Sequence, residues 1–165
     1  MHRSFLIKNL RAVSPLILAL LLGTVTVAWG QESDSAKVAR VLNESASNLT
    51  KTAESAWKVE FEGKSLKDIY VGVGVGEGLA VVYTRFMQTK DVKFSQEVMV
   101  NLLKLNFTFD RVKIGIDPEN VVFVRTDVSV RTLDKQEMSA LLEQVAAAAD
   151  ETYKLLSPHL QKPSK

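Results

Sequence analysis

Apolar residues recur in the first part of the chain at intervals of three and four positions, the spacing that places them on one face of an α-helix. This stripe consists of Val38, Val41, Leu42, Ala46, Leu49, Ala53 and Ala56. Just before it, Ser33, Asp34 and Ser35 each offer a side-chain oxygen that can accept a hydrogen bond from a free backbone N–H at the start of a helix. The pattern therefore predicts a first amphipathic helix that buries one face.

From Trp57 onward the apolar spacing becomes two, which is the period of a β-strand with one buried face. Trp57, Val59 and Phe61 alternate with charged residues. A second run alternates Ile69, Val71, Val73 and Val75 with Tyr70, Gly72, Gly74 and Gly76. A turn at Glu77–Gly78 then leads into Leu79–Met87. We therefore expect three strands, of which the last two form a hairpin.

The second half repeats this change of period. Ser95 can cap a short helix with the apolar residues Val98, Met99, Leu102, Leu103 and Leu105. Two segments rich in β-branched residues follow, Val112–Ile116 and Val121–Val130, and they flank a turn at Asp117–Asn120. The pattern predicts a second helix and a second hairpin.

The last predicted element is a long helix. Asp134, with Glu137 three positions later, resembles a capping box, and Pro158 ends the apolar stripe. The stripe consists of Met138, Leu141, Leu142, Val145, Ala148, Ala149, Thr152 and Leu156. The order α-β-β-β-α-β-β-α favours an α+β fold, an antiparallel sheet of about five strands covered by helices, over a doubly wound α/β fold. No linker divides residues 31–165, so we expect a single domain there.

Residues 1–30 have the pattern of a signal peptide. Basic residues precede an apolar run at Pro15–Trp29, small residues stand at Ala28 and Gly30, and polar residues begin at Gln31. We predict cleavage after Gly30 and a periplasmic or secreted protein. An uncleaved membrane anchor is the alternative, although the apolar run of about 15 residues is shorter than the roughly 20 that span a bilayer.

Charge and composition narrow the class of protein further. The net charge is +2, but the first thirty residues hold three basic residues and no acid, so the remainder carries one excess negative charge. We therefore expect no nucleic-acid partner. The absence of cysteine excludes disulfides, thiolate metal sites and cysteine nucleophiles. A hydrophobic content of 46% is typical of a globular rather than a disordered chain.

Catalytic and cofactor chemistry has few candidates after residue 30. His159 lies beside Pro158 in the C-terminal tail, where we expect a solvated side chain rather than a general base. The glycines of Gly72–Gly78 alternate within a strand instead of joining a strand to a helix, so they do not form a phosphate-binding loop. The acids near Asp117 lack the spacing of a calcium loop. We therefore expect no enzymatic activity, no cofactor and no metal site.

Four sequence motifs lie after residue 97. They are Leu102–Asn106 as "LLxLN", Val112–Asp117 as "VxxGxD", Arg131–Asp134 as "RTLD" after a strand, and an alanine-rich closing helix at Met138–Leu156. With these motifs and its order of elements, the chain resembles the Tir-chaperone superfamily, which includes the CesT-like type III secretion chaperones and the YbjN-like proteins. The resemblance covers nearly all of the chain after the signal peptide.

This resemblance implies a small, non-enzymatic and often homodimeric protein that binds segments of other proteins on apolar sheet and helix surfaces. Secretion chaperones act in the cytoplasm and are usually acidic, whereas this chain has an export signal and a nearly neutral body. Two hypotheses remain: an exported chaperone-like protein-binding module, or a structural or regulatory YbjN-like homodimer without a client. A small-ligand carrier or an enzyme is a more distant alternative.

Two surfaces are candidates for protein binding. In the second helix apolar residues wrap most of the circumference, so one side can face the sheet while a second subunit covers the other. These residues are Val98, Met99, Leu102, Leu103 and Leu105. The first helix or the Met87–Phe94 connection is the alternative cover. The second candidate is the strip Tyr70, Gly72, Gly74 and Gly76, where missing side chains allow close approach of a helix or another chain.

Overall fold

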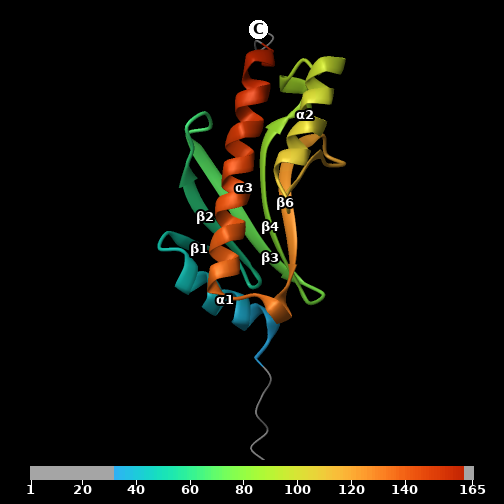
Figure 1. Cartoon of the computed structure of the whole chain (residues 1–165). Helices are drawn as coiled ribbons and strands as arrows, with labels where there is room; N and C mark the ends of the chain where they lie inside the picture. The colour runs from blue at the N-terminus through green and yellow to red at the C-terminus, as the bar shows by residue number, and fades with distance from the viewer. Residues whose placement is uncertain (1–31, 162–165) are drawn as a thin grey trace, which may run out of the picture. The chain divides into compact units, whose positions relative to one another are not determined.

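Residues 32–161 are described by a computed structural model, in which three α-helices pack with a six-stranded sheet (Figure 1). The helices are α1 (Asp34–Ser45), α2 (Gln96–Thr108) and α3 (Lys135–Leu156). The strands are β1 (Leu49–Ala53), β2 (Ala56–Glu62), β3 (Asp68–Gly76), β4 (Leu79–Gln88), β5 (Lys113–Ile116) and β6 (Val121–Ser129). The single turns of 3-10 helix are η2 (Thr89–Asp91), η3 (Val130–Thr132) and η4 (Ser157–His159). The predicted signal peptide and its cleavage after Gly30 lie outside the described residues.

Each α-helix begins at the polar residue that the sequence offers as a cap. Side-chain oxygens of Ser33, Ser95 and Asp134 accept the amide three residues further on, at 3.2, 3.2 and 2.8 Å. The reciprocal half of the predicted capping box is not made, because the carboxylate of Glu137 binds Arg111 instead. The caps therefore confirm where the helices start.

The first helix is shorter than predicted, and this changes the strand count. Helix α1 ends at Ser45, and Leu49–Ala53 form β1, which pairs with β2. Strand β1 lies at the edge of the sheet and four of its five side chains are exposed, so it lacks the apolar alternation that would identify a strand. The α+β class with an antiparallel sheet is confirmed, with six strands instead of about five and the order α-β-β-β-β-α-β-β-α.

The sheet has the strand order β1-β2-β3-β4-β6-β5, and all its pairs are antiparallel. Its register places apolar residues on the same face, as where Val73 pairs with Trp57 on β2 and with Val82 on β4. The predicted turn between β3 and β4 is present, with positive φ angles of 51° at Glu77 and 76° at Gly78.

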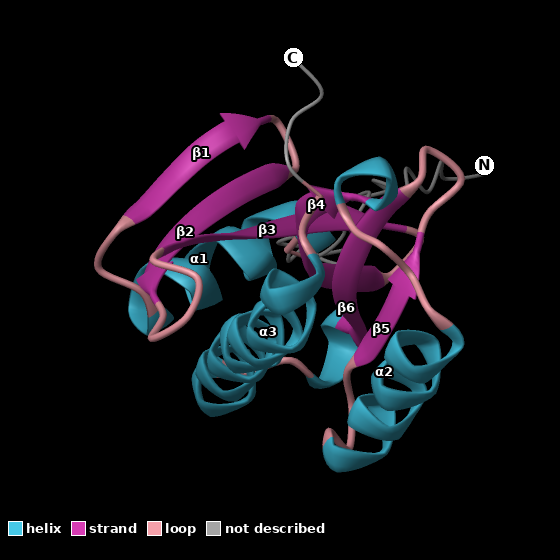
Figure 2. Cartoon of the chain, turned by 90° about the horizontal axis from the view of Figure 1, so that it is seen from above, coloured by secondary structure: helices cyan, strands magenta, loops and turns pink. Residues whose placement is uncertain are grey.

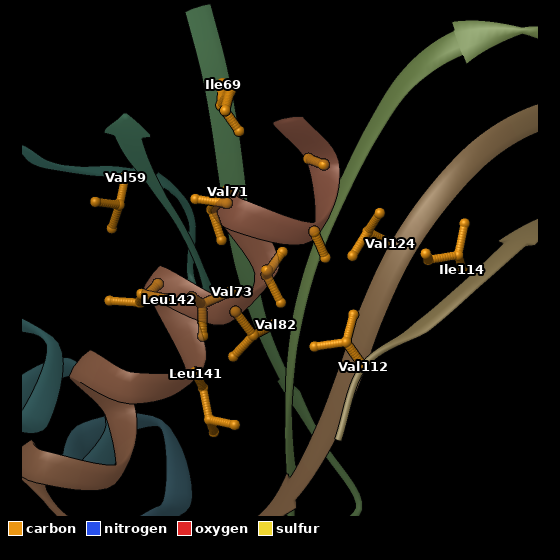
Figure 3. Packing of buried hydrophobic residues seen from close by; sticks show 14 of the residues in the cluster. Val59, Ile69, Val71, Val73, Val82, Val112, Ile114, Val124, Leu141 and Leu142 are labelled. Carbon is orange, nitrogen blue, oxygen red and sulfur yellow. The ribbon is translucent and has the colours of Figure 1, made fainter. Parts of the chain in front are cut away.

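Helices α1 and α3 cover one face of the sheet and enclose the core (Figure 2). Helix α3 packs on β3, β4 and β6, while α1 packs on α3 and β3. Leu141 and Leu142 of α3 are buried against the valines and isoleucines of the strands (Figure 3), and Val145 of the same helix is buried in the same core. Each such side chain contributes about 1.5–3 kcal/mol through burial, so this helix face holds the fold together.

The C-terminal tail is held by backbone pairing. The N–H of Lys93 donates to the carbonyl of His159 at 2.9 Å, and the N–H of Gln161 donates to the carbonyl of Asp91 at 2.8 Å. The side chain of His159 is exposed, as predicted. These hydrogen bonds hold the C-terminal tail against the segment that leads into α2.

Candidate protein-binding surfaces

Helix α2 divides its predicted apolar residues between the core and the surface. Val98 and Leu102 are buried, and Leu105 is half-buried against the core. Met99 and Leu103 are exposed, Leu103 to 68%. The helix packs on β5 and α3, which accounts for the buried side. The five residues predicted to form one binding surface therefore include only two that are open to a partner.

The exposed residues of α2 continue onto β5. Met99, Leu103 and Phe107 follow each other at intervals of four positions, so they lie on one flank of the helix. Beside them, Met99, Leu103 and Ile116 line a hollow of about 260 Å³. Phe107 is 91% exposed. We call Met99, Leu103, Phe107 and Ile116 the α2–β5 patch. The prediction missed Phe107, although its four-residue spacing from Leu103 would have found it.

Asn106 holds α2 against the edge of the sheet. Its amide nitrogen donates to the carbonyl of Ile114 at 3.0 Å, and its amide oxygen accepts the N–H of Ile114 at 2.7 Å. Both backbone groups of Ile114 that point away from β6 are thereby occupied. The last residue of the LLxLN motif thus closes the β5 edge to an additional strand at this position.

The glycine strip lies on the face of the sheet opposite to α1 and α3. Tyr70 is exposed, and Gly74 and Gly76 have no atoms within 4 Å of where a Cβ would stand. Gly72 is different, because the ring of Tyr83 lies over it and would stand 2.9 Å from an added Cβ. The structure places the strip on β3, in the interior of the sheet, and the α2–β5 patch at the β5 edge, so they are two separate surfaces.

The two edges of the sheet differ in access. Strand β1 pairs with β2 on one side only, and its residues from Thr50 to Ala53 are exposed. Strand β5, at the opposite edge, is hydrogen-bonded at Ile114 to the side chain of Asn106 from α2. A further strand can therefore pair with β1 more easily than with β5.

Two chemical features of residues 32–161 bear on other functions. No group of three or more His, Asp or Glu side chains within this range is placed to hold a metal ion. None of the helices described there is long and apolar enough to cross a membrane.

Comparison with known proteins identifies the fold. No family model and no curated protein matches the sequence. Among solved structures, the ExsC–ExsE complex contains a chain that aligns with a TM-score of 0.54 at 16% identity, over 74% of this chain and 95% of that one. The Yersinia pestis type III secretion chaperone SycH, in complex with a stable fragment of YscM2, aligns with a TM-score of 0.51 at 12% identity, over 74% of this chain and 99% of SycH. The chain has the fold of the type III secretion chaperones, as its motifs predicted.

Proposed function

We propose that this chain is an exported, non-enzymatic, chaperone-like protein-binding module that acts as a homodimer. The observation that carries the proposal is the α2–β5 patch, whose most exposed members are Leu103 and Phe107. Contiguous apolar side chains on the surface of a soluble protein mark a site where another protein excludes water. SycH and the chain from the ExsC–ExsE complex share the fold and were each solved with a bound protein, which supports a protein partner.

A second copy of the chain is the proposed cover of the α2–β5 patch. A twofold axis through this patch brings Leu103 of one subunit against the same patch of the other, so one apolar surface satisfies both. Because Asn106 occupies the β5 edge at Ile114, the contact is made by side chains rather than by strand pairing across β5. This arrangement leaves β1 of each subunit accessible.

The open edge of β1 is the proposed site for a client. An extended segment of another protein can add to β1 as a seventh strand, since main-chain hydrogen bonds supply affinity without demanding one sequence. Three of the four exposed side chains on β1 are polar, those of Thr50, Lys51 and Thr52. They suit a partner that is held through its backbone.

Export is the third part of the proposal, and it rests on the apolar run Pro15–Trp29 with small residues at Ala28 and Gly30. Intact-mass measurement of protein from the cell envelope tests it. We expect the mature chain to begin at Gln31. A mass that retains residues 1–30 contradicts cleavage and favours the anchored form.

Sedimentation equilibrium at micromolar concentration tests the dimer. We expect a dimer mass for the native chain and a monomer mass for Leu103→Lys, because the introduced charge would be buried in the interface. Leu79→Lys is the matched control, since Leu79 is 41% exposed but lies at the β3–β4 turn. A native monomer, or a dimer that survives Leu103→Lys, refutes this interface.

Site-specific photocrosslinking in cells tests the client site. A photoreactive residue at Thr50 is expected to link to a different protein, whereas one at Glu151, exposed on α3, is not. Equal linkage at both positions, or none at Thr50, contradicts client capture on β1. In that outcome the homodimer without a client becomes the better description.

A further inference from the structure

The sheet face without α1 or α3 carries two aromatic rings, each lying over a glycine. The register places Tyr83 of β4 between Gly72 of β3 and Arg125 of β6. In the next row, Phe123 of β6 pairs with Gly115 of β5. An added Cβ would stand 2.9 Å from the Tyr83 ring at Gly72 and 2.8 Å from the Phe123 ring at Gly115. The rings can pack against the backbone at positions 72 and 115 only because glycine has no Cβ there.

Because Gly72 and Gly115 lie on the strands outside β4 and β6, the two rings lean away from each other. This leaves a hollow of about 390 Å³ between them, which we call the outer hollow. Its walls are formed by Val81, Tyr83 and Phe123 together with Arg85, Arg125 and the turn at Ile116–Pro118. The volume is in the range of sites that hold small organic molecules, which is roughly 300–1,000 Å³.

The charges around the outer hollow are arranged asymmetrically. Arg85 forms ion pairs with the turn between β5 and β6: its Nε lies 2.7 Å from Asp117 Oδ2, and its Nη2 contacts Glu119. Hydrogen bonds from the N–H of Val121, together with that of Glu119 and the Arg85 guanidinium, hold the pKa of Asp117 below its ordinary value. Asp117 is thus a fixed anion in this turn.

Arg125 also lines the outer hollow, and beside it one carboxylate, that of Asp127, lies between two cations. Asp127 Oδ1 accepts Arg125 Nε at 2.7 Å, and Asp127 Oδ2 lies 3.5 Å from Lys113 Nζ. This group carries a net charge of +1. The contacts of Arg125 within residues 32–161 use its Nε, which leaves the two terminal NH₂ groups to a ligand.

We propose that the outer hollow binds a small molecule with a flat apolar body and a single carboxylate. The body lies between Tyr83 and Phe123, where aromatic faces and Val81 exclude water. The carboxylate accepts hydrogen bonds from the terminal NH₂ groups of Arg125, a pairing that the planar guanidinium favours. The ligand's negative charge offsets the +1 of the Arg125, Asp127 and Lys113 group, while the Arg85, Asp117 and Glu119 group keeps its own net charge of −1 at the turn. The site borders the α2–β5 patch at Ile116, but its ligand-binding residues Tyr83, Phe123 and Arg125 are not part of that patch, so it goes beyond partner binding.

Isothermal titration of the exported protein with 2-naphthoate tests this site. We expect saturable binding of one molecule per chain. The uncharged analogue 2-naphthylmethanol is expected to bind about tenfold more weakly, because it lacks the charge-assisted hydrogen bonds to Arg125. Arg125→Gln is expected to weaken naphthoate binding about tenfold and to leave the affinity for the alcohol unchanged. Arg111→Gln is the matched control, since Arg111 pairs with Glu137 away from the hollow.

A second pair of variants tests the geometry independently of charge. Gly115→Ala forces the Phe123 ring toward the hollow, so it should reduce binding of both compounds at least fivefold. Gly74→Ala has open space around the new methyl group and should change neither affinity. Thermal unfolding of each variant shows whether the fold is retained. Naphthoate binding that does not saturate, that equals binding of the alcohol, or that responds equally to Arg125→Gln and Arg111→Gln overturns the proposal.

Discussion

Asp150, on α3, accepts the backbone N–H of Leu66 at 2.7 Å although 84 positions separate the two residues. The same carboxylate oxygen accepts the N–H of Ser65 at 2.7 Å. Leu66 and Ser65 belong to the loop between β2 and β3, and Asp150 is buried against it. A single side chain thus ties this loop to the helix that covers the sheet.

Replacing Asp150 with Ala is expected to lower the free energy of unfolding by about 2–4 kcal/mol, because two loop amides lose a charged acceptor in a buried place. Urea denaturation measures this change. Glu151→Ala is the control, since Glu151 is exposed on the same helix and should alter stability by less than about 0.5 kcal/mol. Equal losses for the two variants would show that the loop does not depend on Asp150.

The same contact predicts a dependence of stability on pH. Burial raises the pKa of Asp150, but hydrogen bonds from the N–H groups of Leu66, Ser65 and Lys64 outweigh it and leave the pKa below its ordinary value. The stabilisation is therefore fully present above the unfolded-state pKa of about 3.9 and is lost as the pH falls through the lower folded-state pKa. The stability difference between native chain and Asp150→Asn should be constant from about pH 7 to 5 and shrink below about pH 4. A difference that stays constant down to pH 2.5 contradicts this assignment.

Gly63 is the position that lets the loop reach Asp150. An added Cβ at Gly63 would collide with the Asp150 carboxylate and would stand 2.5 Å from the carbonyl oxygen of Leu66. We expect Gly63→Ala to lower the free energy of unfolding by about 1–3 kcal/mol, as overpacking typically does. Gly74→Ala, where the space is open, is the matched control for thermal denaturation. If both variants melt together, the loop can adjust and the close approach is not needed.

The buried strands could be predicted from the sequence because one face of each is covered by helices. In β3, the buried residues Ile69, Val71 and Val73 alternate with Gly72 and other residues on the outer face. Burial of one face is therefore visible in the sequence as an alternation of apolar and other residues. The sequence of β1 shows no such alternation, because Thr50 and its neighbours are exposed to solvent at the edge of the sheet. Its β-structure comes from pairing with β2, a long-range interaction that a local pattern does not contain.

The binding surfaces could be predicted only in part. The spacing showed that α2 is apolar on most of its circumference, but which side is buried depends on where β5 and α3 lie. The structure turns Val98 and Leu102 inward and leaves Leu103 outside. The pairing of Asn106 with Ile114 joins separate elements, and local periodicity carries no signal for it.

Two leucines on different helices separate core packing from partner binding. Leu142 of α3 is 2% exposed, whereas Leu103 of α2 is 68% exposed. Leu142→Asp places a carboxylate among apolar side chains, so we expect a loss of more than about 4 kcal/mol and a chain that is largely unfolded at room temperature. Leu103→Asp should keep the circular dichroism spectrum and lose only the proposed dimer, because its side chain faces water in the single chain. Circular dichroism and sedimentation of both variants measure these two effects. A folded Leu142→Asp variant would mean that this face of α3 is open, and the partner surface would then have to be sought on α3 rather than on α2.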